Sequence, residues 1–220
     1  MDKNDAINIW GYPFSNRIKE KLELRIMKRG ERILGAGEPI DGLYLLVEGR
    51  YYVTTQEVTG KELLLRYCHP PAILGDIEIF QSCPVQSDCI ADRECTFLWI
   101  PLAVYRNDLQ QDAAFCQLLL KELSFKLQTC TVSSRVNALS SVATRLAAYL
   151  CTIATDENYT HYMSTTNLTD IASLIGTTKR HLNRVLKDWV ELNIVERSEE
   201  GISILDWQQI EGISEGIRYE

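Results

Sequence analysis

The segment from Thr166 to Val195 constrains the fold of this chain more than any other stretch. It reads TNLTDIASLIGTTKRHLNRVLKDWVELNIV, which contains two short helical patterns on either side of a glycine. In the second pattern, apolar residues recur at the spacing of one helix face, and basic residues repeat on the other face. The apolar set is Leu182, Val185, Leu186, Trp189 and Val190. We therefore expect one face of this helix to be buried and the other to be cationic.

The turn and the caps of this segment are typical of a helix-turn-helix. Asn167 and Asp170 have the spacing of a capping box for the first helix. Gly176 comes where the turn needs a left-handed residue, and Thr178 can cap the second helix. Basic residues then occupy the first turn of that helix, where the dipole disfavours a cation by about 0.3–1 kcal/mol. An approaching polyanion explains this choice.

The cationic face is predicted to bind double-stranded DNA, with its side chains in contact with phosphates and bases. The candidate DNA-binding residues are Thr178, Lys179, Arg180, His181, Asn183, Arg184 and Lys187. The chain as a whole has 23 basic and 30 acidic residues and a net charge of −7, so contact with DNA has to be local. The alternative is an ordinary helical hairpin with a solvated charged face.

Two short β-prone runs follow the second helix. Ile194-Val195 and the run from Ile202 to Leu205 enclose a glycine-containing turn, which predicts a small hairpin, or wing. Glu199 and Glu200 make the tip of this hairpin acidic. We therefore expect the tip to avoid the phosphate backbone.

The amino-terminal half has the pattern of a compact all-β unit over about residues 31–101. Leu43 to Thr55 reads as strand, turn and strand around Glu48-Gly49, and a second hairpin precedes the run Leu63 to Tyr67. Gln86 to Ala91 and Cys95 to Ile100 are expected to be two further strands. Many short strands with regular turns predict a sandwich or roll. The first thirty residues are mixed and partly helical.

A long helical stretch, roughly Val104 to Leu139, follows the β unit. Apolar residues recur in it at spacings of 4, 3, 4 and 3, the heptad pattern of a helix that pairs with its own copy. The predicted dimer seam is Cys116, Leu120, Leu123, Leu127 and Cys130, and Ser134 and Asn137 continue it as polar positions. The alternative is a helix packed flat on the β unit through Leu118, Leu119 and Phe125. We expect one side on the β unit and the seam against a partner.

This order of elements resembles the catabolite-activator / fumarate-nitrate-regulator (Crp/Fnr) family of bacterial transcription regulators. The resemblance covers nearly the whole chain, and the GDIEIF phrase is similar to the divergent YeiL-type members. The matching residues are Gly37-Glu38, Gly49, Leu74-Gly75-Asp76, Arg145-Leu146-Ala147 and the helix-turn-helix. Thr178, Lys179 and Arg184 stand where the family has a hydroxyl, a basic residue and an arginine, whereas Arg180 replaces a residue that is often acidic. That departure implies a different operator half-site.

The resemblance implies an α+β fold. Residues 1–110 would form a β-roll effector domain, 111–139 a dimerisation helix and 140–220 a winged helix-turn-helix. It also implies a cytoplasmic homodimer that binds a pseudo-palindromic operator and acts with RNA polymerase.

The segment where family members hold cyclic AMP departs from the family pattern. The effector-pocket candidates are Gly75, Asp76, Ile77, Glu78, Gln86, Ser87 and Asp88. Gln86-Ser87-Asp88 stands where the family has the arginine that holds the phosphate, so the strong countercharge is missing. Like charges about 4 Å apart repel by about 4 kcal/mol at an effective dielectric constant near 20, and Glu78 and Asp88 add negative charge. We therefore predict no cyclic nucleotide, and a neutral or cationic effector or none.

Other classes of function find little support in the residues. Seven cysteines without a Cys-x-x-Cys pair indicate reduced thiols that pack as small hydrophobes, with redox sensing as the alternative. The histidines, including His69, do not converge on a metal site, so neither metal nor cofactor is predicted. No catalytic motif is present, so we expect no enzyme. The sequence contains no run of eighteen apolar residues, so we expect no membrane-spanning helix. The rival function is a ligand-binding or protein-interaction module whose helix-turn-helix is only a scaffold.

Overall fold

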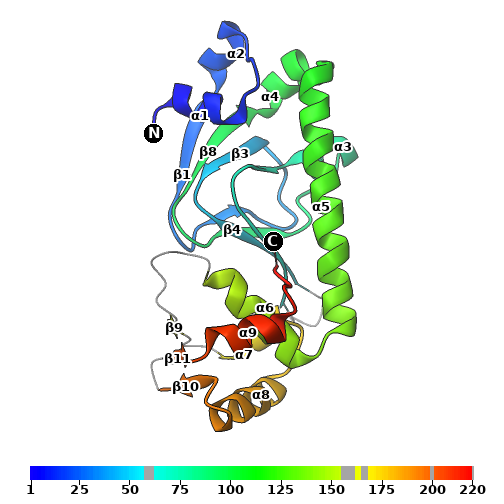
Figure 1. Cartoon of the computed structure of the whole chain (residues 1–220). Helices are drawn as coiled ribbons and strands as arrows, with labels where there is room; N and C mark the ends of the chain where they lie inside the picture. Colours follow the sequence, from blue (N-terminus) through cyan, green and yellow to red (C-terminus); the bar gives the residue numbers. More distant parts are fainter. Residues whose placement is uncertain (57–61, 155–161, 165–167, 199–200, 220) are drawn as a thin grey trace. The chain divides into compact units, whose positions relative to one another are not determined.

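The computed structural model describes residues 1–56, 62–154, 162–164, 168–198 and 201–219. It divides into two compact units, each with its own internal contacts. The first comprises Met1–Thr55 and Tyr67–Gln128, and the second comprises Gln56–Arg66 and Thr129–Glu220. The first unit combines most of strands β1 to β8 with several helices, and the second unit is mainly helical (Figure 1), which confirms the predicted α+β class.

Most of the strands in two four-stranded sheets belong to the first unit, in line with the predicted sandwich or roll, whereas β5 up to Arg66 belongs to the second unit. The antiparallel sheet has the order β1-β8-β3-β6: β1 (Glu23–Met27), β8 (Cys95–Pro101), β3 (Gly42–Glu48) and β6 (Ala72–Leu74). The other has the order β2-β7-β4-β5: β2 (Arg32–Leu34), β7 (Asp88–Ala91), β4 (Tyr51–Gln56) and β5 (Glu62–Cys68). The sequence pattern did not reveal β1, β2 and β6. Strands β2 and β6 have only three residues each, and β1 precedes the predicted β unit.

Strand β3 connects the two halves of the roll core. Side chains alternate between the two faces of a strand. Leu43, Leu45 and Val47 enter one apolar cluster, whereas Tyr44 and Leu46 enter the other. Both faces are covered, so the strand reads as a continuous apolar run rather than an alternating one.

Short helices surround this roll. They are α1 (Lys3–Trp10), α2 (Asn16–Lys21), α3 (Asp76–Gln81), α4 (Leu102–Val104) and the π-helix η1 (Tyr105–Leu109). Ala6, Ile7 and Trp10 of α1 are buried in the roll core, so the amino-terminal segment belongs to this unit. Helix α3 holds part of the predicted effector segment, and α4 with η1 leads towards the long helix.

Helix α5 (Ala113–Leu139) is one continuous helix of 27 residues (Figure 1), shorter than the predicted stretch because η1 and a turn precede it. The carboxylate of Asp112 accepts a hydrogen bond from the backbone N–H of Phe115 at 2.8 Å, which caps its first turn. Within the part of the chain that the structure describes, no helix is both long and apolar enough to cross a membrane.

The second unit has the order of a winged helix-turn-helix, as predicted. Its helices are α6 (Val142–Ile153), α7 (Leu168–Leu174), α8 (Lys179–Glu191) and α9 (Trp207–Ser214). Its sheet has the order β10-β11-β9, with β10 (Val195–Arg197), β11 (Gly201–Ile204) and β9 (Tyr162–Ser164). The buried Tyr219 follows α9 and ties it to the unit, because its backbone N–H donates to Thr152 Oγ1 at 3.0 Å.

Candidate nucleic-acid interface

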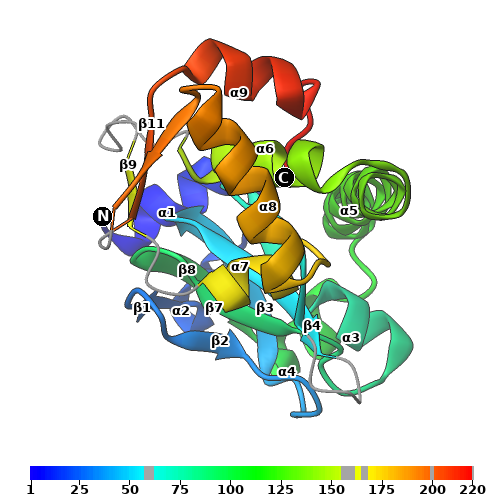
Figure 2. The ribbon, with the colours of Figure 1, turned by 90° about the horizontal axis from the view of Figure 1, so that it is seen from below.

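Helix α8 has the two faces that the sequence predicted. Leu182, Val185, Leu186 and Trp189 are buried, and none is more than 7% exposed. Val190, which the apolar stripe included, is 40% exposed, so its predicted burial is wrong. The buried face of α8 is therefore narrower than the sequence pattern predicted. On the polar face His181 and Asn183 are half-buried, and the cations are exposed. Helix α7 lies beside α8 in Figure 2.

The turn before α8 has the expected geometry. Gly176 has φ of 65°, a left-handed conformation that most side chains avoid. The hydroxyl of Thr178 accepts a hydrogen bond from the backbone N–H of His181 at 3.2 Å, as an N-cap does. The other predicted cap, Asn167, lies outside the described residues. These contacts fix the direction in which α8 leaves the turn.

Arg145 of α6 holds this turn from within the same unit. Its Nη1 donates to the carbonyl oxygen of Ile175 at 2.7 Å and to that of Gly176 at 3.1 Å. These carbonyls lie at the end of α7, where helix carbonyl groups lack partners in the helix. The sequence pattern did not assign this role. The only signal for it was a charged residue inside the apolar helix VATRLAAYLCTI.

The basic side chains of α8 are exposed to solvent. Lys179 and Arg180 are exposed in the first turn, which contains no acidic residue. Arg184 is also exposed, and its Nη2 donates to His181 Nε2 at 2.7 Å. Among the described residues, no carboxylate forms an ion pair with Arg180 or Arg184. The positive end of the helix dipole and these cations together favour an anion at this end of α8.

Lys187 and Asn183 have partners on the same surface. Lys187 forms an ion pair with Glu191 at 3.6 Å, but both side chains are well exposed, and such pairs contribute at most about 1 kcal/mol. Asn183 Oδ1 accepts a hydrogen bond from Nη1 of Arg197 at 2.8 Å. Arg197 belongs to β10, and the sequence pattern did not include it among the candidates. The structure thus adds a cation from the wing to the seven predicted residues.

The predicted wing is present beside α8. Strands β10 and β11 pair in antiparallel register, with Val195 opposite Ile204 and Arg197 opposite Ile202. Val195, Ile202 and Ile204 are buried, which fixes which face of the hairpin points inward. The predicted acidic tip, Glu199 and Glu200, lies outside the described residues.

The predicted effector segment has a cation that the sequence argument overlooked. Asp76 at the start of α3 is 1% exposed, and its Oδ1 lies 2.5 Å from Nζ of Lys126 on α5. The same ammonium group donates to the carbonyl oxygen of Ile73 at 2.6 Å. Gly75, just before Asp76, has φ of 91°, and a Cβ there would lie 2.6 Å from the carbonyl oxygen of Gly42. The close approach between the backbones of Gly75 and Gly42 therefore helps to place Asp76 next to Lys126.

The structure does not bring all the effector-pocket candidates together. Ile77 is 40% exposed on the outer side of α3. Glu78 accepts a hydrogen bond from the backbone N–H of Gln86 at 3.3 Å, and Asp88 accepts one from that of Ala36 at 3.0 Å. Backbone groups and the Arg32 guanidinium, 3.8 Å from Asp88, thus offset part of the negative charge that the sequence argument counted. Ser87 is half-buried next to them.

Two family models match this chain in the order of its two units. Residues 24–112 match the cyclic nucleotide-binding domain, and residues 144–213 match the Crp-like helix-turn-helix domain. The chain belongs to the Crp/Fnr family of transcription regulators. Membership of this regulator family also confirms that the chain is not an enzyme.

Relatives in the Crp/Fnr family match most of the chain. Regulatory protein YeiL of Escherichia coli O157:H7 is 26% identical over 182 residues, 83% of this chain and 81% of YeiL. A CRP-like cAMP-activated global transcriptional regulator of Mycobacterium tuberculosis H37Rv is 23% identical over 190 residues, 83% of this chain and 84% of that protein. These matches agree with the similarity to YeiL-type members predicted from GDIEIF.

Solved structures show the same fold. A transcriptional regulator of the crp/fnr family from Eubacterium rectale superimposes with a TM-score of 0.84 at 18% identity, covering 94% of this chain and 99% of that one. TTHB099, a CRP-family regulator from Thermus thermophilus, gives a TM-score of 0.72 at 18% identity, with coverages of 89% and 98%. At this identity the likeness concerns the fold alone.

Most of the cysteine side chains are buried in ways that lower the reactivity of their thiols. Cys68, Cys89, Cys95 and Cys151 are buried, which fits small hydrophobes. Burial raises the pKa of Cys89 and Cys151 and raises that of Cys95 to about 11, so the reactive thiolate is suppressed. Within the described ranges, no three histidine, cysteine or acidic side chains gather as metal ligands would.

Proposed function

We propose that this protein is a homodimeric, sequence-specific regulator that reads double-stranded DNA with α8. One observation carries the proposal: the guanidinium groups of Arg180 and Arg184 lie exposed on a helix whose opposite face is buried. Had they been turned inward or paired with carboxylates, the surface could not receive a duplex. In a helix-turn-helix, the amino-terminal part of the second helix contacts base edges in the major groove.

The positions along α8 suggest different roles. We assign Arg180 and Arg184 to guanine edges, where an arginine can donate two hydrogen bonds to O6 and N7. Lys187 is assigned to phosphate. The Thr178 hydroxyl accepts the capping bond and still has its own proton to donate to a phosphate. The remaining candidates, Lys179, His181 and Asn183, would add contacts at the edge of the same groove.

We further propose that α5 forms the dimer interface through its predicted seam. Leu120 and Leu127 are 58% and 71% exposed, a considerable apolar stripe for a helix in water. Cys116 and Leu123 are half-buried, and Cys130 is exposed. A two-fold dimer would place two α8 helices one helical turn of DNA apart, or a multiple of it, on a pseudo-palindrome. RNA polymerase in the cytoplasm would be the second macromolecular partner.

For the effector domain we propose that the phosphate arginine is absent and that no cyclic nucleotide binds. Gln86 stands at the position of that arginine. The cations near this segment already have carboxylate partners: Lys126 pairs with Asp76, and Arg32 pairs with Glu38 and Asp88. A calorimetric titration of the purified protein with cyclic AMP should show no heat of binding. Saturable binding would contradict this part of the proposal.

The DNA-reading proposal is tested by selecting bound sequences from random duplexes and then measuring Arg180→Ala on the selected operator. The substitution should cost about 1–3 kcal/mol, or about 5- to 150-fold in Kd, and should relax the preference at one base pair. Arg29→Ala is the matched control, because Arg29 is an exposed arginine of the other unit.

Two outcomes would refute this reading. If the Arg180→Ala variant binds the operator as tightly as the parent protein, Arg180 does not contact a guanine edge. Selection without any enriched motif would instead support the rival function, a ligand-binding or protein-interaction module whose helix-turn-helix is a scaffold.

A further inference from the structure

A cavity of about 570 Å³ lies in the first unit and takes part of its lining from the predicted effector segment. Three parts of the chain line it: the loop between β2 and β3, helix α3 with the residues after it, and the α4–η1 stretch. Neither Asp76 nor Lys126 lines it, and of the effector-pocket candidates only Glu78 does. Its volume falls within the range of about 300–1,000 Å³ that is typical of small-molecule sites.

The walls of this cavity are held by backbone contacts. The N–H of Gly37 donates to the carbonyl oxygen of Val85 at 2.8 Å, and the N–H of Val85 donates to that of Glu38 at 2.9 Å. On the opposite wall, η1 is a π-helix, in which the N–H of Gln110 donates to Tyr105 O at 2.7 Å. Single π-turns of this kind are frequent at functional sites. These contacts fix the backbone of two walls of the cavity.

Only two of its lining residues carry charge, and their signs are opposite. Glu78 on α3 is 7% exposed, and within the described residues its carboxylate accepts only the 3.3 Å hydrogen bond from the N–H of Gln86. A carboxylate buried to this extent is costly unless a cation or further donors compensate it. A donor group on a bound molecule would supply that compensation.

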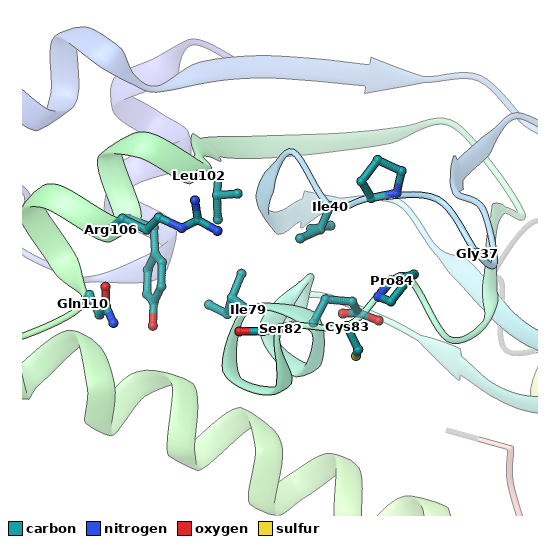
Figure 3. A pocket seen from close by; sticks show the side chains of 12 residues that line it. Gly37, Ile40, Ile79, Ser82, Cys83, Pro84, Leu102, Arg106 and Gln110 are labelled. Carbon is teal, nitrogen blue, oxygen red and sulfur yellow. The ribbon is translucent and has the colours of Figure 1, made fainter.

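Arg106 stands on the other wall. Its side chain is exposed, and no carboxylate in the described part of the chain pairs with it. No ion pair links Arg106 to Glu78. Figure 3 shows Arg106 and Gln110 on one side of the cavity and Ile79 and Ser82 across from them. The two walls thus offer an anion site and a cation site that do not satisfy one another.

The lining also has a substantial apolar part. Ile40, Ile79 and Leu102 are partly buried and face the cavity, and Tyr105 is 4% exposed. Such a lining favours an aliphatic or aromatic group over a sugar or a nucleotide phosphate. The net charge of the lining is zero, because one carboxylate and one guanidinium contribute to it.

We propose that this cavity binds a small apolar zwitterion, an amino acid or short peptide, with its ammonium group on Glu78 and its carboxylate on Arg106. Arginine can hold a carboxylate through two parallel hydrogen bonds. The ammonium group donates to the buried carboxylate of Glu78 and removes its unfavourable desolvation. This site is independent of α8 and of the DNA-reading proposal.

The proposal is tested on the full chain without DNA, by calorimetry and by the shift in melting temperature. L-leucine represents the amino acids, and leucyl-leucine represents the short peptides, which differ in the span between their charges. 3-Methylbutylamine lacks the carboxylate, and 4-methylpentanoate lacks the ammonium group. We expect at least one zwitterion to bind in the millimolar range or tighter, and both single-ended analogues to bind about tenfold or more weakly.

Two cavity variants and two matched controls complete the test. Glu78→Gln and Arg106→Gln should each weaken the zwitterion by about tenfold or more, whereas Glu94→Gln and Arg29→Gln, at exposed positions outside the cavity, should leave it unchanged. Arg106 is exposed, so its variant should fold even if Glu78→Gln does not. No binding of either zwitterion, equal binding of a single-ended analogue, or binding that survives Arg106→Gln would overturn the proposal.

Discussion

At the scale of single residues, the Asp76–Lys126 pair is the most constrained contact of the first unit. Asp76 is 1% exposed, and in the described part of the chain its Oδ2 has no hydrogen-bond partner, whereas its Oδ1 pairs with Lys126. Burying a charge is costly unless it is paired, and breaking such a pair leaves the other charge uncompensated. The pair also joins the amino-terminal end of α3 to the long helix α5.

Lys126→Met should therefore lower the free energy of unfolding by about 3–5 kcal/mol, because it leaves Asp76 charged and buried. The double variant with Asp76→Leu should be more stable than Lys126→Met alone, since it removes both charges. Urea denaturation of the two single variants and the double variant measures this coupling. Strictly additive effects would contradict the role assigned to the pair.

Tyr219 gives the second unit a predictable response to alkali. Burial raises the pKa of Tyr219 from 10.0 to about 12, although Arg145 partly opposes the shift. The neutral phenol is thus favoured in the folded state. Its stabilisation is complete below pH 10 and is lost as the pH rises towards 12, because the unfolded chain releases its proton first.

The difference between wild type and Tyr219→Phe isolates this group. Below pH 10 the variant should be less stable by about 0.5–1.5 kcal/mol, because it loses the hydrogen bond from the phenol to Asn137 Oδ1 at 3.2 Å. Above pH 10, wild type should lose about 1.4 kcal/mol per pH unit relative to the variant. Urea unfolding at a series of pH values tests this, and a difference that is constant with pH would contradict the assignment.

At the scale of elements, α5 carries two neighbouring rows of residues with different surroundings. Phe115, Leu119, Glu122 and Lys126 form a roll-facing row, and none of their side chains is more than 15% exposed. The predicted seam, one position further along, includes the exposed Leu120 and Leu127. The structure thus supports the packed side of the predicted mixture, and the contact of the exposed seam with a partner stays a prediction. Phe125, which the alternative used for packing, is 49% exposed.

Adding charge to the seam should separate the dimer without unfolding the chain. Leu120→Glu together with Leu127→Glu places like charges opposite each other in a paired coil. We expect a monomer in sedimentation equilibrium, and weaker operator binding because two half-sites no longer act together. Lys121→Glu with Gln128→Glu adds negative charge at exposed positions b of the heptad, away from the seam, and should remain dimeric. A dimeric seam variant would remove α5 as the interface.

Local signals were sufficient to predict α8, its cap at Thr178, the wing and the hairpin around Gly49, because each depends on residues close together in the chain. Contacts between distant residues were not predicted. Lys126 lies fifty residues from Asp76, and Arg145 lies thirty from Ile175. Their side chains carry no pattern of their own. Asn137, expected to continue the seam, instead accepts the bond from Tyr219.

At the scale of the whole molecule, the net charge of −7 opposes any general attraction to DNA. The cations of α8 and Arg197 are a local exception on an acidic chain. Binding to random duplexes should be weak, and operator binding should fall as salt rises, because phosphate contacts release counterions.

Lys187→Gln should reduce the salt dependence by about one unit in the slope of log K against log salt. The substitution should weaken binding to all duplexes to a similar extent, because a phosphate contact carries no base preference. Fluorescence anisotropy at several salt concentrations measures both effects, with the exposed Lys28→Gln as the control. An unchanged slope would show that Lys187 does not reach a phosphate.

The two adjacent rows of α5 have a consequence for how the length of this helix can change. Each residue advances an α-helix by about 100°, so deleting or inserting one residue near Leu119 would turn every later side chain by that angle. Lys126 would leave Asp76, and the seam beyond the change would lose its alignment with the part before it. A change of seven residues nearly restores the angle but moves Lys126 by about 10.5 Å along the helix axis, so the spacing between Phe115 and Lys126 should not vary.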